Sequence, residues 1–237
     1  MLQSDFGTLH LPLRPQEPVP VLSWSDYDEN RILLVLATVT FLIILPTIYN
    51  IFPALRGCMA RSRGNLEVEH SLSTARARNI CARTLFLPLL AIASRYPIYD
   101  AAFIPPVEEA LMRLVRLTET AVAYLFLRDL IHALVFHFGF PRMETETRKA
   151  IRKCIFNYYI LLVLTATASV IGLYVLQAED LAVCRTIWVE IAVFMGIALV
   201  RKSQILRQSC SVLGTFLYLC GLEIIPAAAI VLAGLLL

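Results

Sequence analysis

The sequence predicts an all-α fold, a polytopic bundle of about six transmembrane helices, and three observations support this fold class. Of the 237 residues, 58% are hydrophobic and only 16% are charged, against roughly a quarter in soluble domains. Apolar runs of about 20 residues, the length that crosses a bilayer, recur along the chain. Connections rich in Arg and Lys follow alternate runs, so membrane topology explains the net charge of +3 better than nucleic-acid binding does.

The chain divides into a polar N-terminal tail, residues 1–31, and one membrane domain, residues 32–237. The tail contains several prolines and more acidic than basic residues, and no fold is predicted for it. Six runs in the membrane domain have the length and composition of a span. The predicted spans cover residues 32–50, 81–99, 119–138, 155–176, 181–200 and 212–237.

Prolines and helix length refine this assignment. Pro46 is expected to kink the first span, and Pro88 interrupts the second, which is the weakest of the six. After Pro105 a helical pattern runs unbroken to Phe138, about 50 Å, which exceeds a hydrocarbon core of ~30 Å. Residues 107–118 are therefore predicted to form an amphipathic helix at the membrane interface, ahead of the third span.

Basic residues alternate along this topology. The connections at residues 54–83, 139–154 and 201–211 hold most of the Lys and Arg residues, whereas the turn at 177–180 carries Glu179 and Asp180. Because Lys and Arg collect in cytoplasmic loops, these three connections are expected inside the cell. Both termini are then expected on the non-cytoplasmic side.

Ionisable residues inside the predicted spans are the candidate functional residues, because each costs about 2.5–3.5 kcal/mol at a helix centre. Arg128 and His132 lie one turn apart in the third span, and Asp129 precedes His132 by three residues, so the three are expected to form one patch. Glu190 in the fifth span and Glu223 in the sixth are candidate cross-helix partners. The preferred interpretation is a structural cluster that fixes helix packing; the alternative is a proton relay or an anion pathway.

Pro226 is expected to kink the last span just after Glu223 and to free a backbone carbonyl, as in the broken helices of transporters. No cofactor is predicted, because the chain has no phosphate-binding loop, dinucleotide fingerprint or metalloprotease motif. No metal site is predicted either, because the six cysteines lack ligand spacing.

One near-motif points to an enzyme. Glu108, Glu109 and Arg113 spell EExxxR, which resembles the first motif of the intramembrane glutamyl proteases that process prenylated proteins. In that family a glutamate activates water, and partner histidines follow in later helices. The FxxxH pattern fails at both His132 and His137, so the protease is a remote alternative and the sequence favours a protein without enzymatic activity.

The stretch FLYLCGLEIIP, residues 216–226, lies in the last predicted span. Together with the multi-span body and the acidic, Pro-containing tail, it resembles the Bacteroidota membrane family known as domain of unknown function 4271. The likeness extends over residues 32–237, and its most specific part is this stretch. The resemblance implies a multi-pass protein of the bacterial inner membrane with no established activity, and it gives Glu223 and Pro226 more weight as site residues.

Two classes of function follow. The first and preferred class is a non-enzymatic accessory, assembly or scaffold component of the membrane, whose tail or basic loops contact another membrane protein or a second copy. The second is a small proton-coupled transporter with Asp129, His132, Glu190 and Glu223 along its path. The chain shows no internal repeat of the kind that would favour a transporter. In both classes the lipid bilayer is the expected partner.

Overall fold

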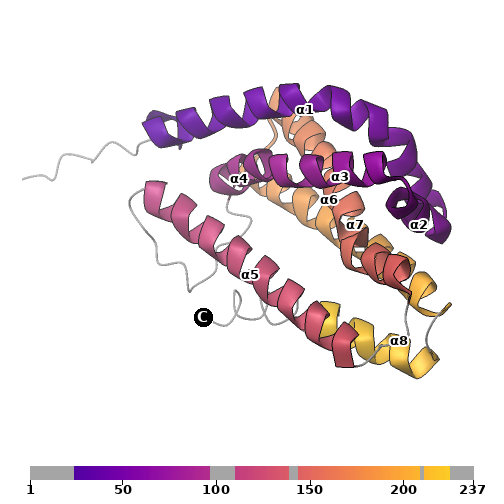
Figure 1. Cartoon of the computed structure of the whole chain (residues 1–237). Helices are drawn as coiled ribbons and strands as arrows, with labels where there is room; N and C mark the ends of the chain where they lie inside the picture. The colour runs from indigo at the N-terminus through magenta and orange to yellow at the C-terminus, as the bar shows by residue number, and fades with distance from the viewer. Residues whose placement is uncertain (1–23, 97–109, 139–143, 209–210, 225–237) are drawn as a thin grey trace, which may run out of the picture.

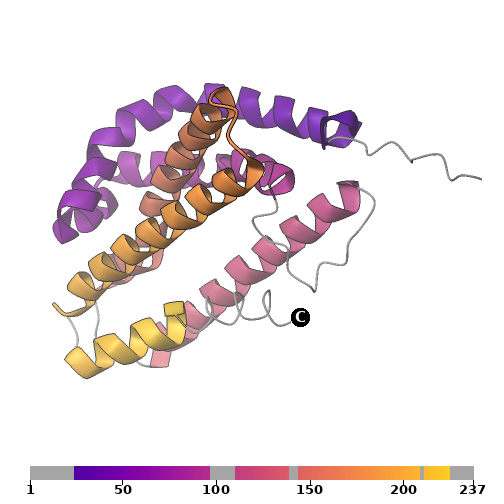
Figure 2. The ribbon, with the colours of Figure 1, turned by 180° about the vertical axis from the view of Figure 1, so that it is seen from behind.

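The computed structural model describes residues 24–96, 110–138, 144–208 and 211–224, and within these ranges the chain is almost entirely α-helical (Figure 1). The described residues contain no β-strand, so the predicted all-α class is confirmed. In both views α1 lies on one side of the hairpin formed by α6 and α7, and α5 and α8 lie on the opposite side (Figure 2).

Three helices of the described chain, not six, are long and apolar enough to cross a membrane. They coincide with the first, fourth and fifth predicted spans. The bounds of these helices are α1 Asp28–Ala60, α6 Thr145–Val175 and α7 Asp180–Leu206. All three extend several residues beyond the predicted bounds at the end where the basic connections lie.

Helix α1 buries one stripe and exposes the rest. Ile44, Ile48, Ile51 and Leu55 recur at helical spacing and form a core with residues of α3 and α6. The opposite face leaves many large apolar side chains exposed, which is the pattern of a helix that meets lipid. Pro46 and an additional proline, Pro53, lie inside the helix without ending it.

The second predicted span is two short helices rather than one. The chain turns through α2, Ser62–His70, and then returns along α1 as α3, Leu72–Thr84, and α4, Phe86–Arg95. Pro88 explains the break, because a proline ring clashes with the carbonyl four residues earlier, here that of Thr84. Neither piece has the length of a span, and residues 97–99 lie outside the described residues.

The third predicted span is part of a continuous helix, as the unbroken helical pattern predicted, whereas the sixth is divided. Helix α5, Ala110–Phe138, joins most of the predicted interfacial segment to the third span. It is not among the three described helices that are long and apolar enough to cross a membrane. The sixth span begins as α8, Val212–Leu219, and continues as a π-helix, Cys220–Ile224. Residues 107–109 and 225–237, with Pro226 among them, lie outside the described residues.

One end of the bundle gathers the basic connections. His70 at the end of α2 contacts Glu146 at the start of α6 at 2.7 Å, and Arg201 near the end of α7 donates to the Ala60 carbonyl at 3.1 Å. At the opposite end, Arg95 of α4 pairs with Asp180 of α7 at 3.0 Å. The ends of α1, α2 and α7 and the start of α6 therefore lie together, as the predicted alternation requires.

Candidate functional site

The candidate site is centred on Glu223, which lies in the π-helix that follows α8. Ser211 starts α8, because its hydroxyl accepts a hydrogen bond from the Gly214 amide at 3.2 Å. A π-turn adds a residue to a helical turn and often occurs at functional sites. The extra residue also brings side chains five positions apart, such as Tyr218 and Glu223, closer to the same face than an α-helix would.

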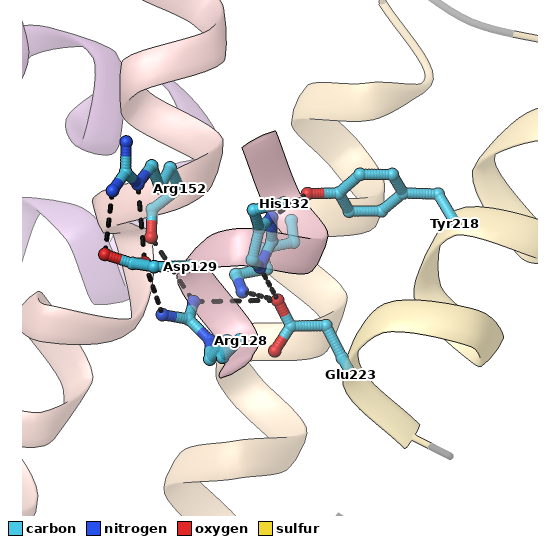
Figure 3. A network of polar contacts seen from close by, with 7 residues as sticks. Arg128, Asp129, His132, Arg152, Tyr218 and Glu223 are labelled. Atoms are coloured by element: carbon cyan, nitrogen blue, oxygen red, sulfur yellow. Dashed lines mark hydrogen bonds and ion pairs between the residues drawn. The ribbon is translucent and has the colours of Figure 1, made fainter. Parts of the chain in front are cut away.

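One carboxylate oxygen of Glu223 meets three basic side chains from two other helices (Figure 3). Its Oε1 accepts from Lys202 Nζ of α7 and lies 3.2 Å from His132 Nε2 and 3.7 Å from Arg128 Nη2, both of α5. All four side chains are 3% exposed or less. Arg128, His132, Lys202 and Glu223 are named the Glu223 cluster below.

His132 links this cluster to Tyr218. The Tyr218 hydroxyl lies 2.8 Å from His132 Nδ1, and the two rings are 5.8 Å apart at their centroids. Because an ionised carboxylate only accepts hydrogen bonds, Nε2 carries the proton that faces Glu223. A neutral His132 then accepts at Nδ1 from the Tyr218 hydroxyl, which gives a chain from Tyr218 through His132 to Glu223.

Asp129 lies at the edge of the cluster, and its side chain pairs with a residue of α6. Arg152 donates to its two carboxylate oxygens at 2.7 and 3.4 Å, and both side chains are nearly half exposed. Arg128 lies between the two groups: its Nη2 donates to the Arg152 carbonyl at 3.3 Å, and its Nη1 is 3.9 Å from Asp129. Arg128 therefore connects the exposed pair to the buried cluster (Figure 3).

The structure does not bring Glu190 to the cluster. Its Oε1 accepts from the Ser169 hydroxyl of α6, and its Oε2 has no hydrogen-bond partner. Glu190 and Lys202 are twelve residues apart on α7, which separates them by about 18 Å along the helix axis. Glu190 is therefore not the cross-helix partner of Arg128 and His132 that the sequence suggested. Pro226 lies outside the described residues.

Lys202 is the residue that sequence reasoning missed, because it stands in a basic connection. Helix α7 in fact continues to Leu206, and both Ile205 and Leu206 are fully buried. Lys202 precedes them by three and four residues, so it shares their face of the helix. The apolar pair after the basic residues was the available signal.

A second buried polar group connects α1, α2 and α6. Asn65 of α2 accepts from Asn157 at 2.8 Å and donates to the Tyr158 hydroxyl at 3.2 Å, and Tyr158 in turn donates to the Cys58 carbonyl at 3.0 Å. Cys154 donates to the same Asn65 oxygen at 3.5 Å. These bonds hold α2 between α1 and α6, and no sequence motif marked them.

In the described ranges, no group of three His, Cys, Asp or Glu residues is placed to hold a metal ion. Cys58, Cys81 and Cys154 are buried free thiols, and Cys184 is buried as well. No family model, no curated protein and no solved structure matches this chain. The resemblance to domain of unknown function 4271 therefore stays a prediction.

Proposed function

We propose that this chain is an integral membrane protein without enzymatic activity, an accessory, assembly or scaffold component of a bacterial inner membrane. The observation that carries the proposal is the single carboxylate of Glu223, which holds basic groups of α5 and α7 to the C-terminal segment. An arrangement in which one buried acid contacts three basic partners ties three segments together and leaves little freedom for turnover.

The proposed topology places the end of the bundle with His70, Glu146 and Arg201 in the cytoplasm and the end with Arg95 and Asp180 outside. Support comes from the three apolar helices and from the basic residues at the first end. Single cysteines, placed in a variant whose native cysteines are replaced by alanine, test it with a membrane-impermeant maleimide. Cysteines at positions 60, 147 and 204 should be protected in intact spheroplasts, and those at 20 and 179 should react. Reaction at any of the first three contradicts the topology.

The accessory role predicts a stable partner. Tagged protein purified in mild detergent should recover one membrane protein, or a second copy of the chain, in stoichiometric amount. Deletion of residues 1–23 tests the tail, and replacement of the exposed Arg61 and Arg63 by Gln tests a basic connection. Recovery of a monomer alone after crosslinking in native membranes contradicts an accessory role.

A proton-coupled transporter is the second candidate, and the hydrogen-bonded chain from Tyr218 through His132 to Glu223 favours it. All three groups can exchange a proton, and all three are buried. This candidate predicts pH-dependent flux into proteoliposomes that Glu223→Gln abolishes while the protein stays folded. Flux that survives this substitution removes Glu223 from the path, and an absence of flux in the wild type favours the accessory role.

A further inference from the structure

The Glu223 cluster and its exposed edge contain one more positive charge than negative. Arg128, Lys202 and Arg152 are the cations, and Glu223 and Asp129 are the anions that contact them. A neutral His132 adds no charge, and a protonated one would increase the excess. The Nε of Arg128 is buried and has no hydrogen-bond partner. An excess cation is costly away from water, and a bound anion would relieve that cost.

The position of the half-exposed pair of Asp129 and Arg152, the exposed edge of the cluster, indicates which class of anion would bind. Arg152 lies seven residues into α6, about 10 Å along the axis from its first residue, and the apolar run of that helix starts at Ile155. Arg152 therefore lies at the level where a bilayer has its headgroups. Both Arg152 and Asp129 are nearly half exposed, so a ligand in the membrane can reach them.

An apolar track leads from this edge along α5. Val122, Leu125 and Phe126 precede Asp129 by seven, four and three residues and share its face of the helix. Their exposed fractions are 58%, 46% and 71%. A charged edge at headgroup level beside exposed apolar side chains matches a phospholipid, whose phosphate and acyl chain are joined in the same order.

We infer that the junction of α5 and α6 at Arg128 and Arg152 binds the phosphate of an anionic phospholipid. A phosphate diester shares one negative charge between two oxygens, which suits two neighbouring guanidinium groups. Asp129 is then an internal competitor, because its carboxylate already pairs with Arg152. The inference rests on the membrane placement proposed above but not on the accessory role.

Native mass spectrometry of the full chain in detergent, with equal amounts of phosphatidylglycerol and phosphatidylcholine, tests this site. The wild type should retain phosphatidylglycerol in preference. Arg152→Gln should weaken retention by about tenfold or more, which is the loss of one charge-assisted hydrogen bond. Asp129→Asn should strengthen retention, because it frees the guanidinium of Arg152. A purely structural role predicts no opposite change in lipid binding for these two variants.

Arg61→Gln is the matched control, because it removes one exposed positive charge at the end of α1, and α1 lies on the side of the α6–α7 hairpin opposite α5 (Figure 1 and Figure 2). It should retain phosphatidylglycerol like the wild type. Equal loss in the Arg61 and Arg152 variants, or equal retention of both lipids, overturns the inference. Thermal protection by inorganic phosphate alone would assign the site to a soluble anion and overturn it too. A chain that stays folded and monomeric in buffer without detergent would instead remove the membrane placement itself.

Discussion

Lys202 of α7 and Glu223 of the π-helix form an ion pair in which each side chain is only 1% exposed. Burying such a pair costs several kcal/mol of hydration per ion, so the pair persists because further partners share the charge. Arg128 and His132 supply those partners on the Glu223 side. The two members of the pair are consequently not equivalent, because Glu223 is the only acid within 4 Å of Lys202 among the described residues.

We expect Glu223→Gln to destabilise the protein more than Lys202→Met. Loss of Glu223 leaves the buried Lys202 without an acid and leaves Arg128 with only the half-exposed Asp129 at 3.9 Å, and breaking a buried pair in this way costs about 3–5 kcal/mol. Loss of Lys202 leaves Arg128 and Glu223, which balance each other. Unfolding in detergent by denaturant titration measures both. The double variant should be more stable than Glu223→Gln alone, and a double variant that is less stable contradicts the charge argument.

Two adjacent tyrosines of α6 allow a controlled test of the second buried polar group. Tyr158→Phe removes a hydroxyl that donates to the Cys58 carbonyl and accepts from Asn65, so it should cost about 1–3 kcal/mol. Tyr159→Phe removes a buried hydroxyl that has no partner and should be neutral or stabilising. Thermal unfolding in one detergent compares the two, and equal losses would show that the hydroxyl bonds of Tyr158 contribute nothing.

The close approach of α1 and α2 predicts a difference between two glycines. A Cβ on Gly64 would lie 2.5 Å from the Gly57 carbonyl oxygen and 2.8 Å from the Cys58 nitrogen, both backbone atoms that cannot move alone. Gly64→Ala should therefore cost about 1–3 kcal/mol of stability. A Cβ on Gly57 meets nothing within 4 Å, so Gly57→Ala should be tolerated. The expression level and melting temperature of the two variants measure this difference. An unchanged melting temperature for Gly64→Ala would contradict the close packing of α1 against α2.

Asp129→Ala should have only a small effect on stability. The sequence suggested that Asp129 pairs with Arg128 and His132, but its principal partner is Arg152, and both carboxylate and guanidinium are nearly half exposed. Such pairs contribute about 0.2–1 kcal/mol because water screens them. A loss as large as that of Glu223→Gln would place Asp129 inside the buried cluster. Melting curves in low and high salt supply the measurement, and the effect should shrink with salt.

The sequence predicted the parts of the fold that depend on local apolar composition. The runs at α1, α6 and α7 are nearly uniform, so their helical form follows from hydropathy, whereas their extensions beyond the predicted bounds do not. The second span was predicted to be the weakest and to be interrupted by Pro88, and in the structure α3 ends at Thr84, four residues before that proline. How much a proline bends a helix depends on its neighbours in space.

The candidate site shows a similar division. The free-energy cost of an ionisable residue inside a span singled out Arg128, His132 and Glu223, and the structure brings these three together. The same cost gave Glu190 equal weight, although Glu190 bonds to Ser169. Lys202 escaped notice because a lysine at a helix end is usually solvated. Helix rotation and tilt decide which polar groups meet, and no single segment of the sequence contains that information.

Because of the π-helix at Cys220–Ile224, the relative orientation of Tyr218 and Glu223 depends on the number of residues between them as well as on their residue types. Losing one residue from this interval would rotate the carboxylate by about 100° relative to the tyrosine while leaving every residue type in place. Related chains, when they are compared, are best sorted by this interval. In chains where the tyrosine and the glutamate are five residues apart in number, both groups can contact opposite sides of one imidazole. In chains where they are four apart, these contacts must be made in another way.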